Sequence, residues 1–146
     1  MKRILPLLAL GLAALSPSIS AAEDPRAIHE RLLTLDTHLD TPSSLRRPGW
    51  SIMDRHTVKD DFTQVDQPRM VEGGLDGGFW VIYTPQGPRT PAGHAAARDT
   101  AIQIAVRIHK MVAANPGVFE IALTSSDASR IFASGKKIVY LSMENS

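Results

Sequence analysis

The residues best suited to chemistry are an aspartate, a histidine and a second aspartate spaced two apart, Asp36-x-His38-x-Asp40, at the end of an apolar segment. Because side chains two residues apart lie on one face of a strand, this spacing predicts that all three point the same way. An imidazole nitrogen and a carboxylate oxygen suit a divalent metal such as Zn²⁺, with Asp36 supporting the ligands from behind. A hydrogen-bonded structural histidine near a strand end is the alternative that the motif leaves open.

Glu144 is a further candidate, because it follows directly after a buried apolar run. A carboxylate in that position is costly unless it is paired or binds a metal ion, and its two oxygens allow it to bridge two ions. If the strands are parallel, their C-terminal ends share one edge of the sheet, where Glu144 would meet His38 and Asp40. A solvated glutamate at a chain end is the alternative.

The other candidate motifs are weaker. Asp54-x-His56 has a similar spacing but lies in a polar loop. The glycine-rich segment 73–78 lacks the order of a phosphate-binding loop, and we expect it to let chain segments approach closely. No G-x-S-x-G or H-E-x-x-H motif is present, and a chain without cysteine has no thiol nucleophile, disulfide or Cys-ligated zinc. We expect structural or solvated roles for the remaining histidines, which are His29, His56, His94 and His109.

These residues must be positioned by an α/β fold, because short apolar runs alternate with helical patterns. The apolar runs are typical of strands in a parallel sheet with covering helices. Asp66 is expected to begin a short helix that ends at Gly73-Gly74. The predicted elements are a helix at 23–31, a strand at 32–38, a polar loop at 41–63, a strand at 77–83, a helix at 94–114, a short strand at 119–123, a helix ending at 134 and a strand at 138–143.

Composition excludes several classes of protein. The chain has 146 residues, of which 43% are hydrophobic and 21% charged, which does not fit a collagen-like, disulfide-scaffold or disordered chain. The formal net charge is +1, and no basic run is present, so a nucleic-acid partner is not expected.

Residues 1–22 have the pattern of a secretory signal peptide. Lys2 and Arg3 precede an apolar stretch at 4–15, and small residues lead to a cleavage site after Ala22. We expect export to the periplasm or the medium, with no stable membrane span after cleavage; an uncleaved membrane anchor is the alternative.

The remaining segment, 23–146, is expected to be an incomplete domain. A (β/α)8 TIM-type barrel needs about 250 residues and eight strands, and this segment supplies three or four. We therefore expect the N-terminal part of such a barrel, truncated after about the third strand. A small complete α/β domain is the alternative.

Four segments in order resemble the zinc membrane dipeptidases, or renal dipeptidases, a family of amidohydrolase-type metallohydrolases on a (β/α)8 barrel. They are LDTHLD at 35–40, QVDQPRM at 64–70 with the glycines that follow, GGFWVIY at 77–83 and GKKIVYLSMEN at 135–145. The resemblance implies two zinc ions, of which His38 and Asp40 bind one and Glu144 bridges both. It also implies that a metal-bound hydroxide hydrolyses dipeptides, with tolerance of a D-residue at the second position.

The same resemblance implies that the chain supplies only part of the site. The family completes its second ion with two histidines from later strands, so we expect a full-length parent to be active and this fragment alone to be inactive. Two alternatives stay open: another amidohydrolase-type enzyme acting on a different C–N bond, and a non-catalytic small periplasmic α/β binding domain. The sequence is compatible with a homodimer but does not fix the oligomeric state.

Overall fold

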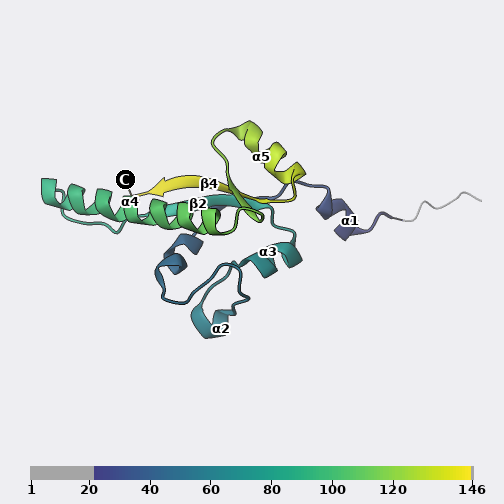
Figure 1. Cartoon of the computed structure of the whole chain (residues 1–146), viewed down its shortest axis with the longest axis horizontal. Coiled ribbons are helices and arrows are strands. Elements are labelled where there is room, and N and C mark those ends of the chain that lie inside the picture. The colour runs from purple at the N-terminus through teal and green to yellow at the C-terminus, as the bar shows by residue number, and fades with distance from the viewer. Residues whose placement is uncertain (1–21, 146) are drawn as a thin grey trace, which may run out of the picture.

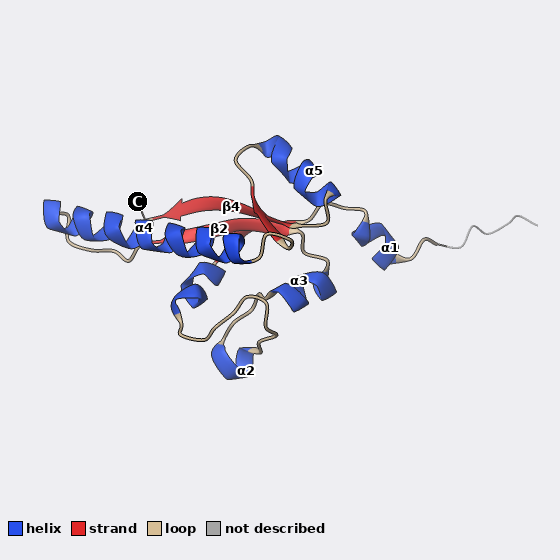
Figure 2. Ribbon diagram, in the orientation of Figure 1, coloured by secondary structure: helices blue, strands red, loops and turns tan. Residues whose placement is uncertain are grey.

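The computed structural model describes residues 22–145, so the predicted signal peptide lies outside the described residues apart from Ala22. Its centre is a sheet of four parallel strands in the order β1-β2-β4-β3 (Figures 1 and 2). The strands are β1 (Leu35–Leu39), β2 (Gly77–Tyr83), β3 (Phe119–Ile121) and β4 (Lys137–Glu144). The expected parallel α/β fold is confirmed. The short strand predicted at 119–123 is present at 119–121, so the last strand is the fourth among the described residues, within the three or four expected.

Residues 22–145 also form six helical segments. They are α1 (Pro25–Glu30), the 3-10 helix η1 (Thr41–Arg46), α2 (Val58–Asp61), α3 (Gln67–Gly73), α4 (Pro91–Ala114) and α5 (Ser125–Ala133). None of the helices among residues 22–145 is both long and apolar enough to cross a membrane. The loop expected at 41–63 contains η1 and α2, and α4 begins three residues earlier than predicted, because Thr90 caps it and Pro91 occupies its first turn.

The sheet separates two hydrophobic cores. On one face, Ile108 and Met111 of α4 pack with Trp80 and Val139, and on the other, Ile131 of α5 packs with Ile138. Figure 1 shows α4 and α5 on opposite sides of the sheet. Since Ile138 and Val139 are neighbours in β4, they point to opposite faces, as the period of a strand requires. On its face of the sheet, helix α5 covers only the beginning of β4. The C-terminal end of β4 is therefore left uncovered on that face.

Two glycines bring the strands together. A Cβ atom on Gly77 would lie 2.2 Å from the carbonyl oxygen of Ile138, and one on Gly78 would lie 2.4 Å from that of Asp36. No side chain fits either position, so β2 depends on these glycines to pair with both of its neighbours. The expected role of the segment 73–78 in close chain approach is confirmed.

Strand β1 runs from Leu35 to Leu39, whereas the prediction was 32–38, so both ends differ. It begins at Leu35 rather than at residue 32, because the backbone N–H of Thr34 donates to the Asp76 side chain instead of continuing the ladder. It also carries an irregularity. Asp36 pairs with Gly78 and Leu39 pairs with Trp80, so three steps along β1 correspond to only two steps along β2. One extra residue in β1 breaks the strict alternation, so Leu35 and Leu39 pack into opposite cores and Thr37 is exposed.

Asp66 ties the long connection between β1 and β2 together. Its fully buried carboxylate caps α3 through the Arg69 N–H at 2.9 Å, pairs with the Arg69 side chain at 2.7 Å and accepts the His56 N–H at 2.8 Å. The predicted cap is confirmed. Burial opposes ionisation of Asp66, but the hydrogen bonds from His56 and Arg69 outweigh it and hold its pKa below the usual range.

Replacing Asp66 by Ala should lower the free energy of unfolding by about 3 kcal/mol, because the Arg69 guanidinium and two buried N–H groups lose their partner. Because the folded-state pKa is lowered, the contribution of Asp66 is fully present above about pH 4 and is lost as the pH falls further. Urea denaturation at pH 7 and pH 3 measures both effects. Asp54→Asn, an exposed control in the same loop, should change stability by less than about 0.5 kcal/mol. Equal stability of the two variants at pH 7 would contradict this role.

Candidate metal centre

The irregularity in β1 turns His38 toward the face of the sheet that is uncovered at the C-terminal ends of the strands. The carboxylate of Asp36 accepts the His38 backbone N–H at 2.7 Å, in the stretch where β1 and β2 are out of register. Leu39 then turns into the core beneath α4, so the imidazole lies on the opposite face of the strand. The His38 side chain is 54% exposed and free to meet groups from other strands.

Asp40 follows β1 and begins η1, but its carboxylate makes no capping hydrogen bond. Aspartate is a preferred capping residue, so an uncapped helix start leaves this side chain available elsewhere. Its Oδ1 atom lies 3.6 Å from His38 Nε2.

Glu144 is the last residue of β4, not a residue beyond it. It lies six positions after Ile138, which places it on the face of the sheet that α5 leaves open at this end. Strand β2 separates β1 from β4, a span of about 10 Å between backbones. The long side chains close that gap, and Glu144 Oε2 lies 3.2 Å from His38 Nε2.

The structure brings three of the four predicted residues together. One ligand atom each from His38, Asp40 and Glu144 lies within 4.8 Å of the others. Asp36 stays outside this cluster, since its carboxylate holds the backbone of His38 and not the imidazole. The cluster therefore combines one nitrogen and two carboxylate groups at the C-terminal ends of parallel strands.

Thr84 fixes the chain around Glu144. This buried residue follows β2, its N–H donates to the Glu144 carbonyl at 3.2 Å, and its hydroxyl donates to the carbonyl of Asn145. Asn145 has a left-handed backbone with φ of 57°, a conformation that asparagine tolerates better than most residues. Thr84 was not predicted to take part, because its only signal in the sequence is its place between an apolar strand and a proline.

A pocket of about 340 Å³ opens beside the cluster. Its walls include His38 and Asp40 on one side and the segment 62–65, with Arg47, on the other. This volume falls in the range of small-molecule sites.

The other histidines do not join the cluster. His29 lies 3.2 Å from the Gly74 carbonyl, and His56 lies between the Asp61 carboxylate and the Ser51 carbonyl. A structural role is thereby confirmed for both. His94 lines a different pocket, and His109 is exposed on α4.

Comparison with known proteins gives a consistent result. The model of the membrane dipeptidase family, peptidase family M19, matches residues 22–146. The chain is 31% identical over 112 residues to dipeptidase ataJ of Aspergillus terreus, a match that covers 73% of this chain and 27% of that protein.

Solved structures of dipeptidases share the fold. The probable dipeptidase PvdM from Pseudomonas aeruginosa superposes with a TM-score of 0.67 at 26% identity, over 81% of this chain and 29% of its own. A metallopeptidase from Rhodobacter sphaeroides, solved with a phosphinate mimic of the dipeptide L-Ala-D-Ala, gives 0.59 at 28% identity, over 77% and 38%.

The chain thus spans less than two-fifths of the length of these relatives. Since the family is built on TIM barrels, the four-stranded sheet corresponds to the N-terminal part of such a barrel. The match over nearly all of the described residues shows that this chain belongs to the membrane dipeptidase family, peptidase family M19.

Proposed function

We propose that the whole protein to which this chain belongs is a zinc-dependent dipeptidase, and that His38, Asp40 and Glu144 are metal ligands. The observation that carries the proposal is the meeting of these side chains, from strands separated by β2, at the C-terminal edge of the sheet. Active sites of barrel enzymes are built at this edge. Membership of a dipeptidase family supports the same reaction.

The donor set fits zinc. Zinc in catalytic sites is bound by histidine nitrogens and carboxylate oxygens, and such sites keep a position open for water or substrate. The three side chains are 54%, 77% and 39% exposed, so they are open to an ion and to substrate. Two carboxylates close to one imidazole also supply the negative charge that balances a dication.

The residues of this chain have distinct proposed roles in the site. His38 and Asp40 would hold one ion, and the Glu144 carboxylate would contribute to the binding of both. Asp36 and Thr84 position the backbone of the ligands, through the His38 N–H and the Glu144 and Asn145 carbonyls. When bound, the metal supplies Lewis acidity that polarises the peptide carbonyl and makes a water acidic.

Dipeptides are the proposed substrates, including those with a D-residue at the second position. The phosphinate dipeptide mimic held by the Rhodobacter relative supports this class. Because the chain spans only part of its relatives, we propose that further ligands come from later strands of the whole protein and that residues 1–146 alone are inactive. Export from the cytoplasm remains a prediction from residues 1–22.

Dipeptide hydrolysis by the whole protein tests this function. Activity should disappear on removal of metal by a chelator and return with zinc, whereas other C–N substrates such as cyclic amides should be cleaved poorly. Hydrolysis of dipeptides that survives exhaustive chelation would contradict a metal-dependent reaction, and selective cleavage of a cyclic amide would favour a different amidohydrolase activity.

Glu144→Gln should reduce the zinc content of the whole protein, because an amide is a weaker ligand and cannot balance the charge of two ions. Metal analysis of purified protein should give about two zinc ions for the wild type and one or none for the variant. Glu30→Gln, on the exposed helix α1, is the matched control and should retain both ions. Two ions retained in Glu144→Gln would remove Glu144 from the ligand set.

A further inference from the structure

Phe62 lies in the wall of the pocket beside His38 and Asp40 but outside the metal cluster. The residue is 81% exposed, although a phenylalanine ring gains most of its stabilisation from burial. Its backbone is left-handed, with φ of 60°, a region that costs energy for any residue with a bulky side chain. Two unfavourable features therefore coincide in one residue at the mouth of the pocket.

The local structure does not require a phenylalanine at position 62. Phe62 follows the last turn of α2 in the left-handed conformation that ends many helices. Glycine or asparagine is favoured at such a position, because the left-handed conformation causes less steric strain in these residues than in others. Residues held in disfavoured backbone regions gather at functional sites, where the side chain is needed for something other than stability.

Hydrogen bonds hold the loop residues on both sides of Phe62. The preceding residue, Asp61, accepts the Trp50 indole N–H at 3.0 Å on its carboxylate and an Arg47 N–H at 2.9 Å on its carbonyl. The following Thr63 N–H donates to the same carboxylate at 2.8 Å. Burial opposes ionisation of Asp61, and the hydrogen bonds from Thr63 and Trp50 outweigh it and lower its pKa.

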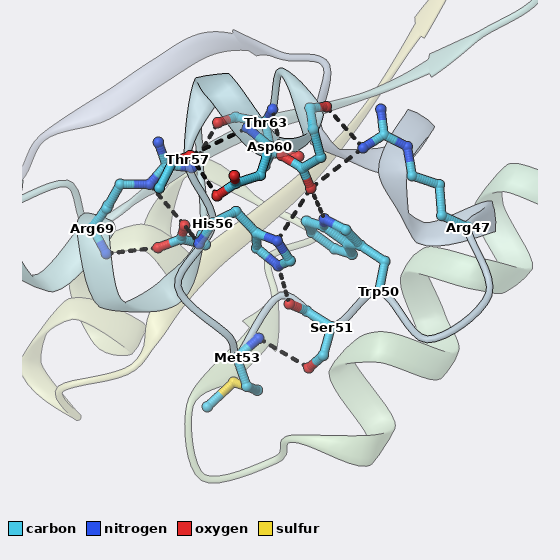
Figure 3. Close-up of polar contacts among 11 residues, drawn as sticks. Arg47, Trp50, Ser51, Met53, His56, Thr57, Asp60, Thr63 and Arg69 are labelled. Carbon is cyan, nitrogen blue, oxygen red and sulfur yellow. Dashed lines mark hydrogen bonds and ion pairs between the residues drawn. The ribbon is translucent and has the colours of Figure 1, made fainter.

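A second layer supports Asp61 from behind. Figure 3 shows the His56 and Trp50 rings packed against each other, with a centroid distance of 4.7 Å. His56 Nδ1 lies 3.1 Å from Asp61 Oδ2, and His56 Nε2 lies 2.8 Å from the Ser51 carbonyl. These contacts hold the backbone on either side of Phe62, which lines the pocket.

The chemistry of this wall indicates what it contacts. Among the described residues that line the pocket, Arg47 is the one arginine or lysine; its Nη1 atom donates to the Asp61 carbonyl and lies 3.4 Å from the Asp61 carboxylate. The charge of Arg47 is therefore paired with Asp61. The segment that carries Phe62 adds the polar residues Thr63 and Gln64 and the apolar Val65 to the lining, so Phe62 and Val65 are the apolar groups on this part of the wall.

We propose that Phe62 is a specificity-determining residue that contacts an apolar side chain of the dipeptide bound at the metal centre. This assignment rests on the proposed dipeptidase function. It predicts a preference for substrates with a large apolar side chain over glycine-only and acidic dipeptides.

The test compares Phe62→Gly with the wild-type whole protein on Gly-Gly, Ala-Leu, Leu-Ala, Ala-Phe, Phe-Ala and Ala-Asp. For the dipeptides whose leucine or phenylalanine reaches this wall, kcat/KM should fall about tenfold, mainly through a higher KM, with a change below about twofold for Gly-Gly. Glycine suits a positive φ, so the melting temperature should stay equal or rise. Phe62→Tyr keeps the ring and should retain the preference.

Leu123→Ala is the matched control, because Leu123 is 85% exposed and does not line this pocket. It should leave all six rates unchanged. An equal loss on every substrate with a lowered melting temperature would show a structural role for Phe62 and overturn the proposal, as would unchanged rates in Phe62→Gly. If the wild type cleaves dipeptides, either result leaves the proposed function standing; if the wild type cleaves none, the proposed function fails and this assignment fails with it.

Discussion

The parallel ladder between β2 and β4 is the constraint on which the site depends. Seven consecutive pairs run from Gly77 with Ile138 to Tyr83 with Glu144 without a break. This register sets how far along the sheet Glu144 lies, and so whether its carboxylate can reach His38 across β2. Gly77 permits the close approach of the two strands, and Thr84 holds the far end of the ladder. A shift of one residue would turn Glu144 to the face covered by α4.

The same site also depends on a break in regularity. Strand β1 is perfectly paired only at its start, and the extra residue after Asp36 places the imidazole of His38 above the sheet and Leu39 beneath it. The connection from η1 to α3 is long and polar, yet the partly buried carboxylate of Asp61 and the buried carboxylate of Asp66 organise it. The pocket is thus lined by the irregular strand β1, by η1 and by a loop whose hydrogen bonds converge on two aspartates.

Much of this arrangement could be predicted from the sequence because it follows from local patterns. The apolar run at 77–83 and the cap at Asp66 each have a direct physical meaning. The common strand face predicted for Asp36, His38 and Asp40 was wrong, because β1 carries an extra residue after Asp36 and ends at Leu39. The pairing of strands at a common edge then predicted the meeting with Glu144, which the geometry bears out. The irregularity in β1 could not be predicted, because it depends on which residues of β2 it faces. The role of Thr84 was missed because its partners, Glu144 and Asn145, are distant in sequence. The role proposed for Phe62 was missed because nothing in the sequence indicates its left-handed backbone or its place in the pocket.

The central claim is that His38, Asp40 and Glu144 bind the same metal centre. Its most direct test is a crystal structure of the whole protein, with anomalous diffraction measured at the zinc absorption edge. The account predicts an ion about 2.0–2.2 Å from a nitrogen of His38 and an oxygen of Asp40, with a carboxylate oxygen of Glu144 bound at the same centre. A zinc signal located elsewhere, with these three side chains only hydrogen-bonded to one another, would contradict it.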